Sequence, residues 1–121
     1  MRPTILAFNL SLSRLNLLKL AAIRLNLAVE TVQPLEQSRT VGDLFGLGTR
    51  AATAHVPPVF DAEMLIFGGM ENQQINALLA TLRQMQVPPF PLKAILTPTN
   101  AAWRCGELYA ELCKERQQFQ R

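Results

Sequence analysis

At 121 residues the chain has the length of one ordinary domain with a hydrophobic core, whereas two independent domains of half this length would each be marginal. Charged residues make up 17% and apolar residues 49%, so we expect some apolar surface to contact a partner, most simply a second copy. The net charge of +3 comes from basic residues that are scattered along the chain, and this pattern argues against nucleic-acid binding.

The chain contains two cysteines and one histidine. On a single helix, Cys105 and Cys113 would lie about 12 Å apart along the axis, beyond the ~7 Å between Cα atoms that a disulfide spans. We therefore expect free thiols, which are typical of a reducing, cytoplasmic setting. Because only His55 could join the two cysteines, we expect no metal site and no cofactor.

The beginning of the chain predicts a strand, a helix, a second strand and a short second helix. The apolar run at residues 4–8 is typical of a strand that is buried on both faces. Ser11 can cap a helix over residues 12–25. A second strand follows at residues 28–32, and Thr40 opens the short helix.

The remainder predicts the same order of elements after an irregular connector. Residues 47–62 form this connector, because glycine and proline interrupt them. A strand is expected at residues 64–67, an amphipathic helix at about 72–86 and a fourth strand at 92–96. The last helix begins at about residue 104.

The two long helices differ in how their apolar residues are distributed. The helix over residues 12–25 is apolar on nearly all sides, whereas the helix over residues 72–86 is apolar on one face. Leu17, Leu20 and Ile23 lie outside the stripe that an ordinary core would bury. We therefore predict that this helix packs partly against a second subunit in a homodimer.

The first thirty residues have a basic bias that is shared by transit peptides and by helices on membrane surfaces. They contain four basic residues and no acid before Glu30. Their similarity to the later half of the chain argues against both interpretations, and no stretch is long enough to span a bilayer. We therefore expect no membrane association.

The similarity between the halves extends over most of their length. Residues 32–45 align without a gap with residues 96–109, which pairs Pro34 with Pro98, Gly42 with Gly106 and Leu44 with Leu108. We interpret this as a tandem duplication within one domain, residues 1–121. Repeat one is residues 1–46, the connector is residues 47–62, and repeat two is residues 63–121.

Each repeat reads strand, helix, strand, helix, so the predicted fold class is α/β with one four-stranded, mostly parallel sheet. A pseudo-twofold axis along the strands gives the strand order 2-1-3-4 with helices on both faces. The carboxyl ends of the central strands would then form a crevice of the kind that binds ligands in α/β proteins. The residues expected to bind a ligand there are Asn9, Ser11, Gly68, Gly69, Thr97, Thr99, Asn100 and Trp103.

These residue types allow two interpretations. Thr97, Thr99 and Asn100 could hold an anion or a small polar ligand, or they could satisfy the donors of a turn. Trp103 could close a pocket or serve as a packing anchor. The glycine pair lacks the spacing of a phosphate-binding loop. No serine, cysteine or histidine has the partners that catalysis needs, so we predict no catalytic residue.

The string Lys-Ala-Ile-Leu-Thr-Pro-Thr-Asn at residues 93–100, followed by Trp103 and by Gly-Glu-Leu-Tyr at residues 106–109, resembles a bacterial family known as domain of unknown function 3783. The resemblance covers about residues 63–116 and implies an intracellular bacterial protein with no established activity. Relatives often carry a helix-capping threonine where this chain has Arg104, which leaves open which residue caps the last helix.

Two functions of different classes follow from these observations. The first is a non-enzymatic module that binds an unknown protein or small molecule and acts as a homo-oligomer. It is favoured by the missing catalytic constellation and by the apolar first helix. The second is a small enzyme or nucleotide-binding domain that uses the crevice at the carboxyl ends of the strands.

Overall fold

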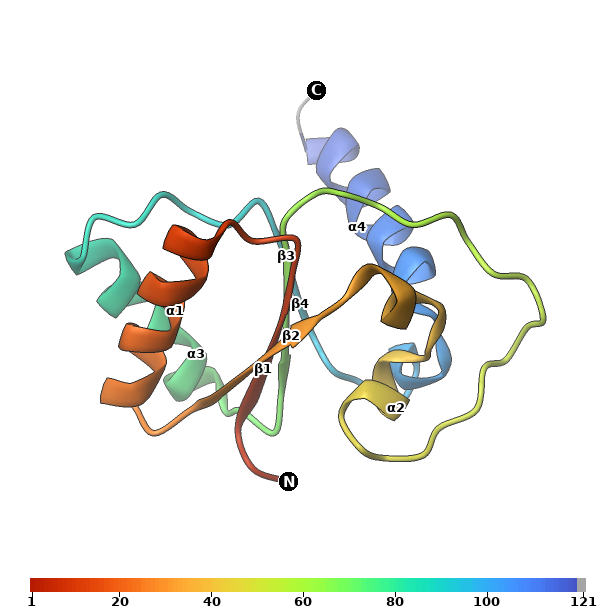
Figure 1. Cartoon of the computed structure of the whole chain (residues 1–121), viewed down its shortest axis with the longest axis horizontal. Helices are drawn as coiled ribbons and strands as arrows, with labels where there is room; N and C mark the ends of the chain where they lie inside the picture. Colours follow the sequence, from red (N-terminus) through yellow and green to blue (C-terminus); the bar gives the residue numbers. More distant parts are fainter. Residues whose placement is uncertain (120–121) are drawn as a thin grey trace.

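The computed structural model describes the backbone of residues 1–119 and the side chains of residues 1–116 (Figure 1). The strands are β1 (Thr4–Phe8), β2 (Ala28–Val32), β3 (Met64–Gly68) and β4 (Leu92–Ile95). The long helices are α1 (Leu12–Arg24), α3 (Asn72–Gln84) and α4 (Cys105–Phe119), and the short ones are η1 (Pro34–Ser38), α2 (Val41–Leu44) and η2 (Asn100–Ala102). None of the described helices is long and apolar enough to cross a bilayer.

The strands form one sheet in the order β2-β1-β3-β4, so the predicted mixed α/β class and the predicted strand order are confirmed. β1 is parallel to β2, and β3 is parallel to β4. The central pair, β1 and β3, is antiparallel, with Leu6 opposite Ile66 at its centre. The expected twofold axis along the strands, which would make the central pair of a mostly parallel sheet parallel, is therefore wrong at the middle of the sheet.

The antiparallel pair changes the symmetry that relates the two halves. β1 and α1 correspond in sequence to β3 and α3, because each lies the same number of residues before its counterpart. The strand pairing corresponds as well: Thr4 of β1 is paired with the first residue of β2, and Met64 of β3 is paired with the first residue of β4. A pseudo-twofold axis perpendicular to the sheet reverses strand direction and keeps equivalent helices on one face. A common ancestry of the halves stays a prediction.

Helices cover both faces of the sheet, and a separate core lies under each face. Figure 1 shows α1 and α3 together on one side of the sheet, and α2 and α4 on the other. The first core contains Ile5, Ala7, Leu65 and Phe67 of the central strands with Leu18, Leu78 and Leu82 of the helices. The second core contains Leu6, Phe8, Met64 and Ile66 with Val41, Phe60, Cys105 and Leu108. Both central strands are therefore buried on both faces.

The two long helices of the first face have matching ends. The Ser11 hydroxyl accepts a hydrogen bond from the Arg14 backbone N–H at 3.4 Å at the start of α1. A capping box between Glu71 and Gln74 opens α3. The chain leaves α1 at Asn26 and α3 at Gln86, which have φ angles of 58° and 59°. These left-handed residues stop each helix and return the chain to the sheet.

On the second face, the starts of α2 and α4 lie side by side. Thr40 and Arg104 form an isolated bridge, and the Val41 N–H donates to the Trp103 carbonyl at 2.9 Å. The Thr40 hydroxyl accepts from the Asp43 N–H and caps α2. Arg104 is the residue before α4, and its N–H donates to Glu107 Oε1 at 2.9 Å. Glu107 therefore completes the start of α4 without a threonine.

The connector between residues 46 and 63 is held against this junction by polar groups. The Arg104 guanidinium donates to the carbonyls of Thr53 and His55. The Gln37 side chain pairs with both backbone groups of Phe60, at 3.0 Å and 3.2 Å. Phe60 in turn stacks on Tyr109 with ring centroids 4.3 Å apart. The connector is irregular, as predicted, and it is also packed.

Arg14 joins the two halves on the opposite face. Its Nε lies 2.6 Å from Glu63 Oε2, and both side chains are mostly buried, at 19% and 25% exposure. The guanidinium also lies 4.2 Å from the centre of the Phe90 ring and donates to the Pro88 carbonyl. The Arg14 side chain of α1 thus binds Glu63, the residue before β3, and the proline-containing linker before β4.

We expect Arg14→Ala to lower the free energy of unfolding by about 2–3 kcal/mol, because it leaves Glu63 half-buried without its partner and uncovers Phe90. Urea denaturation measures this change. Lys19→Ala, on the exposed side of the same helix, is the matched control and should change it by less than about 0.5 kcal/mol. Equal effects of the two substitutions would contradict this role of Arg14.

Candidate binding groove

The structure separates the residues that were expected to share one crevice. Because β1 and β3 are antiparallel, their carboxyl ends lie at opposite ends of the sheet. Asn9 and Ser11 follow β1 at one end, whereas Gly68 and Gly69 lie at the other, next to the end of β4. The crevice predicted between the two central strands therefore does not form.

The residues at the end of β1 have structural partners. Asn9 has a φ of 63°, and its amide donates to the carbonyls of Phe60 and Ala62, both at 3.0 Å. Ser11 caps α1. Asn9 therefore fastens the connector to the end of the strand through its amide nitrogen, and the Ser11 hydroxyl oxygen is engaged at the start of α1.

The glycine pair also has a structural explanation. A Cβ on Gly68 would collide with the Phe45 ring, so the absence of a side chain lets the ring pack on the backbone. Gly69 has a φ of 67°, in the left-handed region that favours glycine, and lies close to the Met1 carbonyl. Glycine therefore allows close packing at position 68 and a left-handed turn at position 69.

Thr97 and Asn100 form a closed turn after β4. The Thr97 N–H donates to Asn100 Oδ1 at 2.9 Å, and the Asn100 N–H donates to Thr97 Oγ1 at 3.0 Å. The Asn100 amide also donates to the Ile95 carbonyl at 2.9 Å. These groups satisfy a turn, which is one of the two interpretations that the sequence allowed.

A hollow of about 560 Å³ lies beside this turn and brings together four of the predicted residues. One wall comes from Ile75 and Leu79 of α3, and the other from Leu108 and Leu112 of α4. Strand β4 lies between the walls and contributes Lys93, Ala94 and Ile95, while Thr97, Thr99, Asn100 and Trp103 line the end where the turn lies. We call this hollow the β4 groove. It is mainly apolar and lies at the open side of an edge strand.

Three charged side chains border the β4 groove. Glu111 and Glu115 lie on the α4 side, and Lys93 projects from the strand. The Lys93 ammonium donates to the Phe90 carbonyl at 2.6 Å, and partial burial lowers its pKa, with a smaller contribution from Arg116. The lining therefore contains two acids and one base around an apolar centre.

In the part of the chain that the structure describes, no other strand pairs with the outer side of the β4 backbone. The Leu96 N–H donates to the Phe67 carbonyl at 2.8 Å, so alternate residues Leu92, Ala94 and Leu96 direct their backbone groups toward β3. Lys93 and Ile95 direct theirs into the groove, where the Ile95 carbonyl accepts the Asn100 amide. No motif in the sequence points to Lys93, Ile95 or Leu112, although the predicted strand order already places β4 at an edge.

The face predicted to contact a second subunit is partly exposed. Ile23 is 74% exposed and Leu20 is 53% exposed, whereas Leu17 is half-buried and packs against the first core. The equivalent positions on α3 to Leu20 and Ile23 are Ala80 and Arg83. The α1 face is thus more apolar than its counterpart, and its contact with a second copy stays a prediction.

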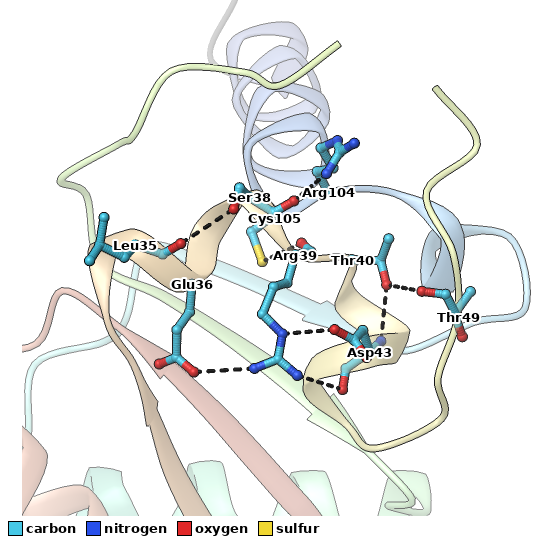
Figure 2. A network of polar contacts seen from close by, with 9 residues as sticks. All are labelled: Leu35, Glu36, Ser38, Arg39, Thr40, Asp43, Thr49, Arg104 and Cys105. Atoms are coloured by element: carbon cyan, nitrogen blue, oxygen red, sulfur yellow. Dashed lines mark hydrogen bonds and ion pairs between the residues drawn. The ribbon is translucent and has the colours of Figure 1, made fainter. Parts of the chain in front are cut away.

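Figure 2 shows the polar network around Cys105 at the α2–α4 junction. Arg39 bridges Glu36 and Asp43, with its Nε 2.7 Å from Asp43 Oδ2, and the hydrogen bond to Asp43 raises the pKa of Arg39. Cys105 lies beneath, fully buried, with its thiol directed at the Arg39 carbonyl. Burial raises the pKa of Cys105 from 9.0 to about 12, which makes the thiol a poor nucleophile at neutral pH.

The comparisons with known proteins concern one half of the chain. The sequence model of the family described as Domain of unknown function (DUF3783) matches residues 63–119, which contain β3, α3, β4 and α4. No curated protein and no solved structure matches the chain at the significance that we required. The resemblance seen in the sequence is therefore confirmed for the C-terminal half. The lining of the β4 groove lies entirely within the matched residues.

We expect the two cysteines to differ in reactivity. In native protein at pH 8, a thiol reagent should modify the half-buried Cys113 and leave Cys105 unmodified, and both should react in urea. Burial raises the pKa of Cys105 in the folded state. The contribution of the buried thiol to the free energy of unfolding is therefore fully present below about pH 9 and is lost as the pH rises toward 12. Fast labelling of native Cys113→Ser would contradict this expectation.

Proposed function

We propose that this protein is a non-enzymatic binding module that acts as a homo-oligomer and binds polypeptide in the β4 groove. The observation that supports this most directly is the joining of an open strand edge with two apolar helical walls. Backbone groups at such an edge hydrogen-bond to an extended chain, and adjacent pockets take its alternate side chains.

The shape of the groove favours a polypeptide over a small molecule. Its volume of about 560 Å³ falls within the usual range for small ligands, but it is open along the strand. The polar groups of Thr97 and Asn100, which a small polar ligand would need, already bond to each other. The unpaired groups are those of the β4 backbone, which suit another chain.

The alternative, a small enzyme or nucleotide-binding domain, depended on the crevice between the central strands. With β1 and β3 antiparallel, its residues lie at opposite ends of the sheet. The buried Cys105 thiol has a raised pKa, and Ser11 serves as a helix cap. We therefore favour binding over catalysis.

Three further properties belong to this proposal. We propose a bacterial origin, which is what the resemblance of the sequence to this family implies. A cytoplasmic location is consistent with two cysteines that are not bonded to each other. A tandem duplication is supported by the shared order of elements in the two halves and by their matching strand pairing.

Native mass spectrometry of the protein purified from its own host tests the proposed function. We expect the mass of a homo-oligomer, or that of the chain with another polypeptide. The single tryptophan, Trp103, lines the groove, so its emission should change when the groove is emptied by dilution. A bare monomer with constant Trp103 emission would contradict the proposal.

A further inference from the structure

We propose that the occupant of the β4 groove is strand β4 of a second copy, so that two chains join edge to edge into one continuous sheet. This inference rests on the proposed function and specifies its partner. The sequence predicted that two copies would contact each other through α1. This inference places the contact at the edge strand β4 instead.

The outward backbone groups of β4 suit an antiparallel copy of the same strand. The N–H and C=O of Lys93 and the N–H of Ile95 point away from β3, as the alternation along the strand requires. A twofold axis at Ala94 places Lys93 opposite Ile95 of the second copy, and each such pair exchanges two hydrogen bonds. The Ile95 carbonyl can accept the additional bond because a carbonyl oxygen has two lone pairs.

The side chains of the same segment fit the groove in this register. Leu92, Ala94 and Leu96 face the second core, so Leu92 comes opposite Leu96 of the second copy on the α4 side. Ile95, which is 47% exposed in the single chain, becomes covered on the α3 side. The second copy thus supplies apolar side chains to both apolar walls.

The charges of the groove favour one register of this strand. Glu111 and Glu115 border the groove on the α4 side, and Lys93, which alternates with Ala94 as Ile95 does, lies on the α3 side, so both signs are present at the contact. The register about Ala94 places each Lys93 opposite Ile95 of the second copy and keeps the two lysines from facing each other. A register centred on Lys93 would place like charges directly opposite and is disfavoured.

The other edge of the sheet lacks the features that support pairing. Each edge strand carries an exposed charged residue, Glu30 on β2 and Lys93 on β4, so charge alone does not distinguish the two edges. The two hollows beside β2 are about 180 Å³ and about 360 Å³, both smaller than the β4 groove. On the α2 side of this edge the helix is only four residues long, so among the described residues the edge has one long helical wall, α1. Pairing through β4 alone closes the assembly at two chains.

The α1 face is the rival surface for self-association. Leu20 and Ile23 are exposed there, but Lys19 and Arg24 are exposed beside them, and the chain has no acid before Glu30. A symmetric contact between two such faces brings positive charges together without a compensating acid. The β4 groove carries both signs and unpaired backbone groups, and for that reason we place the second copy there.

Sedimentation velocity on the full chain at micromolar concentration tests the proposal. We expect a dimer for the wild type and for Leu20→Glu, and a monomer for Ile95→Pro. Proline at position 95 removes an outward N–H and breaks no bond to β3, so circular dichroism should stay unchanged. Ile95→Lys, which keeps the N–H and adds a charge at the contact, is the second variant and should weaken association at least about tenfold.

A cross-link tests the register independently. Opposite residues at a non-hydrogen-bonded antiparallel position have Cα atoms about 4.5 Å apart, within the range that a disulfide spans. Ala94→Cys in a Cys113→Ser background should therefore form a covalent dimer on mild oxidation. Leu20→Cys in the same background is the control and should remain uncross-linked.

The outcomes separate this inference from the proposed function. A wild-type dimer that Leu20→Glu disrupts and Ile95→Pro does not would overturn the β4 contact while keeping the homo-oligomer. A one-to-one complex with a different polypeptide that Ile95→Pro disrupts would overturn the second copy as occupant and keep the groove as a binding site. A wild-type monomer in native mass spectrometry with no bound polypeptide would overturn both.

Discussion

The antiparallel pairing of β1 with β3 is the constraint on which the rest of the structure depends. It fixes Leu6 against Ile66 at the centre of the sheet and turns the second half of the chain by a twofold rotation perpendicular to the sheet. This rotation leaves α1 and α3 on the same face and brings the starts of α2 and α4 together on the other. It also sends the carboxyl ends of the two central strands to opposite ends.

The candidate site arises where the two halves have become unlike. Both outer strands are edges, but α4 is fifteen residues long whereas its counterpart α2 has four. The longer helix supplies Leu108 and Leu112 as a second wall, so the groove beside β4 is larger than either hollow beside β2. On the first face it is the first half of the chain that has the more apolar surface. There α1 exposes a leucine and an isoleucine at positions where α3 has a small or a charged residue.

Polar side chains between the halves convert two similar units into one folded body. Arg14 holds Glu63 and the proline linker before β4, and Asn9 holds the carbonyls at the end of the connector. On the other face, Gln37 and Arg104 bind the connector from both halves. Two glycines make this close contact possible, since a Cβ on Gly42 or Gly106 would overlap the connector at Thr49 or Pro57.

The sequence by itself determined the local elements and their order. Apolar runs, Ser11 and Thr40 as caps, and the similarity between the halves were sufficient for the four strands, the long helices and the order 2-1-3-4. They also pointed to Thr97, Thr99, Asn100 and Trp103, which do line one hollow. The direction of β3 relative to β1 was decided only by the tertiary structure. A strand buried on both faces has the same apolar pattern in either direction, and a sixteen-residue connector can reach either end of the sheet. For this reason the crevice could not be located correctly from sequence, and the groove beside β4, which needs α3 and α4 as walls, became visible only in the folded chain.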